Sequence, residues 1–268
     1  MASPAPEKTP AKFEEKFSKK PLFVNEKGQR FFVQGKENEK SGENEVKKFL
    51  KKHPSLFRFL RFLISPSLKF FSYSAGDFIK EFERSSLILN VGAGNSKISS
   101  EIVNIDITPL ENIHIISFAH QMPFKDGTID GIIAEVLLEH VDNIEEVVKE
   151  FHRVLKPAGK VYITAPFLYP FHAVPGDYHR WTKSGLQLLF LDFKTKKIEV
   201  YAGPMATLVL STAYFLALPF SIVSKTLYEY AAYFFLIIMF PLKFLDPLFR
   251  KFPGAHYSAS VFAAVFEK

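Results

Sequence analysis

The chain has 268 residues and is 47% hydrophobic, which allows a sizeable core and excludes a fully disordered protein. It contains no cysteine, so neither disulfides nor thiolate metal sites contribute. Its formal net charge of +6 favours an anionic partner, either nucleic acid or an anionic membrane surface.

The N-terminal part of the chain predicts a tail followed by an extension. Residues 1–20 are rich in proline, alanine and lysine and lack the apolar core of a secretory signal, so we expect a disordered tail and no export by that route. Residues 21–84 predict a hairpin over 22–35 and then helices, in which Arg58 and Arg61 stand among phenylalanines and leucines. Such a basic aromatic helix suits a membrane interface or a partner groove; the alternative is a helix packed on the main domain with its arginines in water.

From residue 85 onward, short apolar runs alternate with helical patterns. A helix is expected over 142–156, with Asp142 as its N-cap and Glu145 completing a capping box, and another over 182–190. Strands are expected at 87–91, 102–107, 113–117, 129–134, 159–165 and 195–201, with a last strand within 256–268. This alternation predicts parallel strands in an open α/β sheet, with ligands beyond the carboxyl ends of the strands.

An apolar segment, residues 204–245, interrupts the α/β pattern. Residues 205–223 carry no charge and residues 226–242 carry only Glu229, so both runs approach the length of a membrane helix. If the last strand joins the sheet, both ends of this insert must meet the same folded domain.

Three alternatives stay open for the insert. It is an interfacial or re-entrant pair of membrane helices, a buried lid or homodimer interface, or a hairpin that spans the membrane. Spanning would carry Lys225 and Glu229 across the bilayer at a cost. At the return end, Lys243, Arg250 and Lys251 suit an anionic surface.

The stretch "LILNVGAGNSKISSEIVNIDI" contains a glycine turn between two strands. Gly92 and Gly94 allow positive φ angles and a close backbone approach to a ligand. A dinucleotide fingerprint would have a third glycine where Lys97 stands and an acidic residue about 20 positions on, whereas Asp106 follows Gly94 after only 12. A ligand without phosphates therefore fits this turn better.

The short spacing also limits what joins the two strands. A parallel crossover needs on the order of 10–12 residues, and residues 92–102 just meet that bound. We expect one or two helical turns there, a thinly covered sheet, and N-terminal residues 56–64 packed over the gap.

Five motifs in order carry a family resemblance: "LILNVGAGNS", "VNIDI", "MPFKDGTIDGIIAEVLLEHV", "EEVVKEFHRVLKPAGKVYITAPF" and "DYHRWTKSGLQLLF". Together they resemble a class I S-adenosylmethionine-dependent methyltransferase of the type 11 kind, over about residues 86–202 and the last strand. The resemblance implies an α/β fold: a three-layer, Rossmann-like open sheet, mostly parallel with an antiparallel last strand. That domain would occupy 85–268, with the apolar insert inside it and the N-terminal helices added to it.

The resemblance also implies a cofactor site for S-adenosylmethionine. The loop Gly92–Gly94 would hold the methionine end, and Asp106 would accept hydrogen bonds from the ribose hydroxyls. Where similar enzymes often have an acidic residue that receives the adenine amino group, this chain has Phe118. Adenine is then expected on the Ala119 and His120 backbone. The expected cofactor-binding residues are Asn90, Gly92, Ala93, Gly94, Asp106, Ile107, Ala119, His120, Met122 and Glu135.

The segment "PFLYPFHAVPGDYHRWT", residues 166–182, is the expected substrate site, because it follows a strand at its carboxyl end. His172 is the first candidate for a base that serves a hydroxyl nucleophile, and His179 and Asp177 come next. The alternative is that Asp177 forms an ion pair with Arg180 that fixes the loop. The three candidates could also bind a metal, but they lack a recognised ligand spacing and a fourth partner, so we expect no metal.

The sequence therefore predicts methyl transfer to the oxygen of an amphiphilic or lipid-linked small molecule, by a cytoplasmic enzyme peripheral on the inner face of a membrane. No dedicated nucleic-acid-binding module is recognised, and a homodimer through 204–245 stays open. Two alternatives remain: a non-catalytic, methyltransferase-like membrane adaptor, suggested by Phe118, and an NAD-dependent oxidoreductase, disfavoured by Lys97 and the early Asp106.

Overall fold

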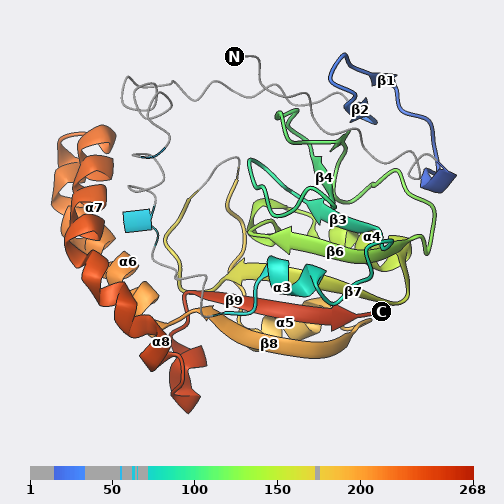
Figure 1. The fold of residues 1–268 in the computed structure, drawn as a ribbon. Coiled ribbons are helices and arrows are strands. Elements are labelled where there is room, and N and C mark those ends of the chain that lie inside the picture. Colours follow the sequence, from blue (N-terminus) through green and yellow to red (C-terminus); the bar gives the residue numbers. More distant parts are fainter. Residues whose placement is uncertain (1–14, 34–54, 56–61, 64, 66–71, 173–175) are drawn as a thin grey trace.

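A single mixed sheet organises the chain, with helices on both of its faces and a helical hairpin at one side (Figure 1). The computed structural model describes residues 15–33, 55, 62–63, 65, 72–172 and 176–268. The strands within these residues run in the order β1-β2-β5-β4-β3-β6-β7-β9-β8. They are β1 (Phe23–Val24), β2 (Arg30–Phe31), β3 (Ile88–Val91), β4 (Val103–Asp106), β5 (Ile115–Ile116), β6 (Ile129–Glu135), β7 (Leu155–Pro166), β8 (Lys194–Ala202) and β9 (Val261–Glu267).

The central strands are parallel and the last strand is antiparallel, as predicted. Neighbours from β2 through β5, β4, β3 and β6 to β7 pair in parallel. Strand β9 lies antiparallel between β7 and β8. The carboxyl ends of β3, β4 and β6 therefore meet at one edge of the sheet, where ligands bind in open α/β sheets.

Two separate apolar cores show that the sheet is the middle of three layers. Successive strand residues point to opposite faces, and Ile132 and Ile133 of β6 accordingly enter different cores. On one face Ile132 packs with Phe151 of helix α4 (Ile144–Val154) and Phe190 beyond α5 (Lys183–Leu189). On the other face Ile133 packs with Phe78 of α3 (Ala75–Ile79).

The two predicted helices exist, and both are shorter than expected. Helix α4 begins after Asn143 with no side-chain cap, because the Asp142 carboxylate accepts only from the Asn143 amide; the prediction of Asp142 as N-cap was wrong. The helix ends at Val154 because Leu155 is already extended and pairs with Ile129. Thr182 caps α5 and accepts from the amide of Gly185.

The connection between β3 and β4 has no helix, contrary to the expected one or two turns; residues 92–102 form turns and bends. Ile98 and Ile102 instead pack with Phe78 of α3, so α3 covers the sheet at this point. The segment 56–64 lies largely outside the described residues, and its described Phe62 packs on rings of the apolar insert, not on this connection.

The N-terminal hairpin extends the main sheet, because β2 pairs in parallel with β5. Residues 15–20, which the sequence analysis assigned to a disordered tail, are among the described residues and contact the main domain. The amide of Ser18 donates to the Pro123 carbonyl and the amide of Lys125 donates to that of Lys16, so residues 16–18 form a bridge to the main domain.

The apolar insert forms a helical hairpin of α6 (Pro204–Ala217) and α7 (Lys225–Met239) (Figure 1). Short helical pieces join and follow it: η4 (Leu218–Ile222), η5 (Phe240–Leu245), α8 (Asp246–Phe249) and η6 (Pro253–Tyr257). The last strand therefore starts at Val261, later than the predicted 256. Two stretches, Pro204–Ile222 and Lys225–Phe249, are by length and composition able to cross a membrane.

Two of the three cations expected on a membrane surface are buried. Lys243 is 1% exposed, with its ammonium group over the ring of Phe62 and donating to the Ser65 carbonyl. The Arg250 side chain is 9% exposed and donates to the Tyr201 carbonyl. These side chains attach the insert to the rest of the chain, whereas Lys251 is exposed.

Candidate active site

The glycine turn follows β3 at the edge where β3, β4 and β6 end. Gly92 has a φ of +68° and Gly94 a φ of +50°, conformations that favour glycine. A Cβ on Gly92 would lie 2.6 Å from Cδ1 of Leu137, whereas a Cβ on Gly94 would have no atom within 4 Å. Ala93 is buried against the sheet. The backbone at Gly94 therefore borders open space. A turn that binds a ligand requires such space.

Asp106 stands at the end of β4 and holds the glycine turn. One carboxylate oxygen accepts from the Gly94 amide at 2.8 Å, and the other accepts from the Thr108 amide at 2.8 Å. Each carboxylate oxygen can accept a further hydrogen bond. The half-buried carboxylate therefore retains capacity for two neighbouring hydroxyl donors, and it fits the ribose role expected of it.

A buried amide network, which the sequence analysis missed, supports the same turn. Asn90 is 2% exposed and its amide nitrogen donates to Asn104 at 3.0 Å. The Asn104 side chain donates to the carbonyl of Asn112, and Asn112 donates to the carbonyls of Gly94 and Ser96. The side chain of Asn90 therefore joins two strands and does not face the cofactor space. Polar side chains inside apolar strands were the signal that could have revealed the network.

The expected adenine side is formed by the segment after β5. The half-buried ring of Phe118 stacks on the exposed ring of His120, with 5.1 Å between centroids. Ala119 and Ile107 are half-buried and available to a ligand. Met122 is only 2% exposed and belongs to the main core, so its side chain does not present a ligand surface.

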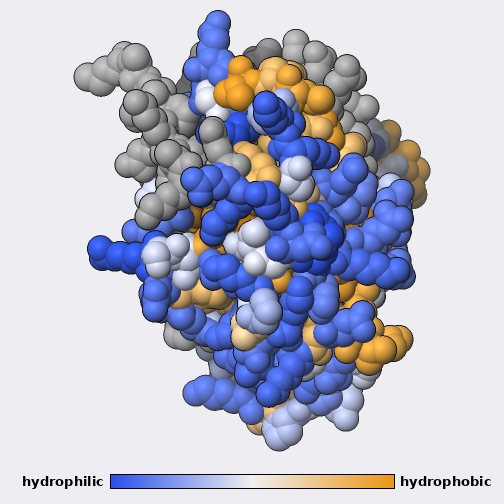
Figure 2. Space-filling model, turned by 90° about the vertical axis from the view of Figure 1, so that its right-hand side faces the viewer, coloured by the Kyte–Doolittle hydropathy of each residue, from blue (hydrophilic) through white to orange (hydrophobic). Residues whose placement is uncertain are grey.

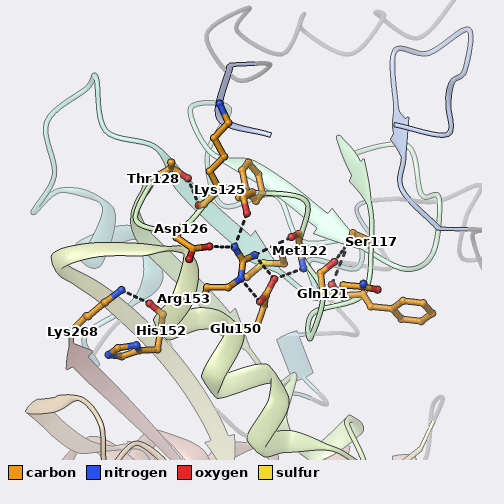
Figure 3. Close-up of polar contacts among 12 residues, drawn as sticks. Ser117, Gln121, Met122, Lys125, Asp126, Thr128, Glu150, His152, Arg153 and Lys268 are labelled. Carbon is orange, nitrogen blue, oxygen red and sulfur yellow. Dashed lines mark hydrogen bonds and ion pairs between the residues drawn. The ribbon is translucent and has the colours of Figure 1, made fainter. Parts of the chain in front are cut away.

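Arg153 of α4 fixes this segment from below (Figure 3). Its guanidinium donates to the Met122 and Phe124 carbonyls and to the Glu150 carboxylate. Glu150 in turn accepts from the Met122 amide at 2.6 Å. The ion pairs with Glu150 and Asp126 raise the pKa of Arg153 above its usual range, so the side chain stays charged. The adenine-side segment is therefore tied to a core helix.

A cavity of about 460 Å³ lies beside the glycine turn, within the usual size range of small-molecule pockets. Glu135, at the end of β6, lines it together with Tyr201 of β8, as the sequence analysis expected for Glu135. The rest of the wall comes from the turn and from the start of α3: Asn95, Ser96, Lys97, Ile98, Ser74, Ala75 and Gly76. Val136 follows with a φ of +54°, a strained conformation for a β-branched residue at the edge of the site.

A second polar cluster lies beyond Val136. It combines Glu139 and His140, which follow β6, with His172 from the loop after β7. Glu139, His140 and His172 each offer a ligand atom, and these atoms lie within 4.8 Å of one another. The Glu139 carboxylate is fully buried, and desolvation raises its pKa to about 7. Desolvation also lowers the pKa of His172, which favours the neutral imidazole. His140, which was not among the predicted site residues, thus belongs to this cluster.

Of the other two catalytic candidates, Asp177 lies beside His172, with its Oδ2 3.5 Å from Nδ1 of that ring, and His179 lies outside the cluster. Asp177 makes a two-pronged ion pair with Arg180 that lowers the pKa of Asp177 below its usual range. Its carboxylate also accepts from the His172 amide at 2.8 Å, so it positions His172 and fixes the loop, as the alternative interpretation expected. The His179 ring lies beside Trp181, and its buried Nε2 has no hydrogen-bond partner among the described residues.

A methyltransferase domain family model matches residues 89–163, which include most of β3, the glycine turn, Asp106 and β6. This part of the chain is a class I S-adenosylmethionine-dependent methyltransferase domain. The match includes residues of four of the five motifs, and the fifth, residues 177–190, lies outside it.

Among curated proteins, the chain is 31% identical over 112 residues to a demethylmenaquinone methyltransferase of Chlorobaculum tepidum, covering 35% of this chain and 46% of that protein. It is 38% identical over 60 residues to a 2-phytyl-1,4-naphtoquinone methyltransferase of Synechocystis sp., covering 22% and 25%. The chain thus spans less than half the length of these relatives. A structure of a putative sarcosine dimethylglycine methyltransferase from Galdieria sulphuraria aligns with a TM-score of 0.46 and 15% identity, over 87% of this chain and 92% of that chain.

Proposed function

We propose that the chain transfers a methyl group from S-adenosylmethionine to an oxygen of an amphiphilic or lipid-linked small molecule at a membrane surface. The observation that carries this proposal is the position of Tyr169. Its ring lies 5.0 Å from the ring of His172, and the same side chain packs on the core between α6 and α7. Tyr169 therefore joins the polar cluster directly to the apolar hairpin, and an acceptor with an apolar tail could contact both.

The hairpin has the surface expected of a membrane-binding element. Only 33% of the most apolar window of Pro204–Ile222 and 22% of that of Lys225–Phe249 is buried. Exposed apolar side chains include Phe215 on α6 and Phe234 and Ile238 on α7. The face of the molecule turned away from the hairpin is mostly hydrophilic (Figure 2). An apolar surface concentrated on one element favours contact with lipid.

An interfacial position suits the hairpin better than a spanning one. Lys225 is exposed at the start of α7 and lies 3.9 Å from Glu229, and η4 separates the two long helices. Spanning would place this pair in the bilayer, which is costly. A hairpin lying in the headgroup region would keep both charges in water and still bury its apolar side chains.

The residues of the site suit an oxygen acceptor. When bound, S-adenosylmethionine supplies a methyl group on a positively charged sulfur. Gly92, Gly94 and Asp106 would hold it, and Glu135 faces the adjoining cavity. The acceptor hydroxyl loses one proton as its oxygen takes the methyl group, so a group that accepts from that hydroxyl is needed. We expect His172 to take this role, because Asp177 holds its backbone and its side chain is 32% exposed.

The names of the curated relatives support an amphiphilic acceptor, since they name demethylmenaquinone and a phytyl naphthoquinone as what those proteins methylate. The test uses the purified chain, labelled S-adenosylmethionine and phenols that carry alkyl tails of increasing length, with and without anionic vesicles. We expect O-methylated product, with a yield that rises with tail length and with vesicles. Equal turnover of tailless phenols without vesicles would contradict the membrane part, and product labelled on carbon would contradict the oxygen part.

Matched variants test the hairpin directly. Phe234→Ser removes an exposed aromatic group from α7 and should lower both vesicle sedimentation and turnover of long-tailed acceptors. Leu191→Ser is the control, because Leu191 is 75% exposed but lies between α5 and β8, away from the hairpin. It should behave like the unchanged chain.

A further inference from the structure

Glu139 carries a buried carboxylate whose charge no hydrogen bond from the described residues offsets. The side chain is 0% exposed, and neither oxygen has a hydrogen-bond partner among the described residues. A buried polar group left without a partner destabilises a fold, and such groups usually have a function or bind an ion. Arg180, the nearest guanidinium in this region, is occupied by Asp177.

The two histidines beside Glu139 are both oriented in the same way. Nδ1 of His140 contacts the carbonyl oxygen of Gly176, and Nδ1 of His172 lies 3.2 Å from the carbonyl oxygen of Pro170. A carbonyl oxygen only accepts, so each Nδ1 carries a proton, and in the neutral form of either ring the lone pair is on Nε2. This arrangement, in which the outer nitrogen is held by a backbone carbonyl, is how proteins orient histidine ligands of a metal.

We infer that Glu139, His140 and His172 bind a first-row transition dication of the Zn²⁺ kind, with a fourth position open. The ligand atoms lie within 4.8 Å of one another, and Nε2 of His172 is 3.8 Å from Oε1 of Glu139. Zinc bonds of about 2.0–2.1 Å in a tetrahedron require ligand atoms about 3.4 Å apart. Small side-chain rotations bring the three groups to that spacing.

The donor set selects the class of ion. Two imidazole nitrogens and one carboxylate oxygen suit zinc and its neighbours, whereas Mg²⁺ prefers oxygen ligands and water. The set differs from the one that the sequence analysis weighed and set aside: it shares only His172, because Asp177 is paired with Arg180 and His179 lies outside the group.

The position of the site gives the ion a role that rests on the proposed function. Glu139 and His140 lie just beyond Leu137, whose side chain packs against Gly92 of the glycine turn. With Nε2 of His172 on the ion, that ring no longer accepts the hydroxyl proton, and the ion takes over its role: a bound dication lowers the pKa of a hydroxyl that it coordinates, and the proton passes to water. Tyr169 beside His172 would place the apolar tail of that acceptor toward the hairpin.

Ion binding itself can be tested without acceptor or cofactor. The full chain, purified without added histidines and freed of metal, is titrated with Zn²⁺ in competition with a coloured chelator, and with Co²⁺ by absorption. We expect one ion per chain and a Zn²⁺ affinity lowered at least ~10-fold by Glu139→Gln and by His172→Ala. His120→Ala, which changes an exposed histidine outside the cluster, should bind as the unchanged chain does.

Thermal unfolding separates loss of ligands from loss of fold. Zn²⁺ should raise the unfolding temperature of the unchanged chain and of His120→Ala, but not that of Glu139→Gln, whose metal-free melting should stay cooperative. Equal Zn²⁺ affinity in Glu139→Gln, fewer than one ion per chain, or tighter binding of Mg²⁺ than of Zn²⁺ would each overturn the inference. None of these results depends on methyl transfer, so ion binding can fail while the proposed function holds, and the reverse.

Discussion

The two glycines of the turn should respond differently to the same added methyl group. Both have positive φ, so alanine at either position costs about 1–2 kcal/mol in the left-handed region. At Gly92 the new Cβ would also lie 2.6 Å from Cδ1 of Leu137, and such overpacking typically adds about 1–3 kcal/mol. We therefore expect Gly92→Ala to lower the free energy of unfolding by about 2–5 kcal/mol and Gly94→Ala by only about 1–2 kcal/mol.

The order of the two changes should be reversed for cofactor binding, which Gly94→Ala should weaken more than Gly92→Ala. A Cβ on Gly94 meets no atom within 4 Å, so it would occupy space that a ligand needs. Gly94→Ala should weaken S-adenosylhomocysteine binding at least ~10-fold, measured by calorimetry, in protein that still unfolds cooperatively in urea. Combining Gly92→Ala with Leu137→Ala should cost less than the sum of the two single changes, because the truncated leucine no longer meets the Cβ. Strict additivity, or a larger stability loss at Gly94 than at Gly92, would refute this account of the turn.

Three further changes test the supports of the site. Arg153→Met leaves the buried Glu150 carboxylate unpaired and should lower the free energy of unfolding by about 1.5–3 kcal/mol in urea, whereas Arg153→Lys should lose less. Asp106→Ala should weaken S-adenosylmethionine binding in calorimetry, and an unchanged affinity would remove its ribose role. Asp77 completes the capping box of α3 with the N-cap Ser74, and Lys80 and Ser74 lower its pKa to about 2. Its stabilising effect is therefore present above its ordinary pKa and is lost as pH falls from about 4 toward 2, so the melting difference from Asp77→Asn should shrink over that range.

The parts of the site that a local pattern determines were predictable from sequence. The positive φ angles of Gly92 and Gly94 follow from turn chemistry, and the Thr182 cap follows from its place before a helical pattern. Asp106 was placed correctly at the end of its strand because spacing along the chain decides that position. Each of these features depends on a few consecutive residues.

Features built from distant segments were not predictable in the same way. Glu139 and His172 come together only because the loop after β7 returns beside the connection after β6, which no periodicity reports. The C-terminal end of the insert was also misjudged, since η6 continues the helical region to Tyr257, whereas the predicted start at 204 is the first residue of α6. The burial of Lys243 shows the same limit, because a lysine at the end of an apolar run is expected in water, but here the described Phe62 and Ser65 supply its partners.

The short connection between β3 and β4 explains why this turn needs so many polar supports. A crossover helix would cover the sheet and hold the glycine turn from behind, but residues 92–102 contain no helix. Packing contacts and side-chain hydrogen bonds take the place of that helix. Apolar cover comes from α3, whose Phe78 packs with Ile98 and Ile102. Rigidity comes from the half-buried amide of Asn112, which donates to the carbonyls of Gly94 and Ser96, and from the buried amide of Asn104, which donates to the carbonyl of Asn112.

Those amides act where a crossover helix would have provided backbone hydrogen bonds. If Asn112 is replaced by leucine, the carbonyls of Gly94 and Ser96 lose their donor, and the turn that Asp106 holds from the other side should loosen. Loss of one such hydrogen bond costs about 0.5–1.5 kcal/mol, too little to unfold a domain but enough to weaken a preformed ligand cradle about 2- to 10-fold. A compact cofactor loop without its helix is therefore expected to be more sensitive in affinity than in stability to changes of its buried asparagines.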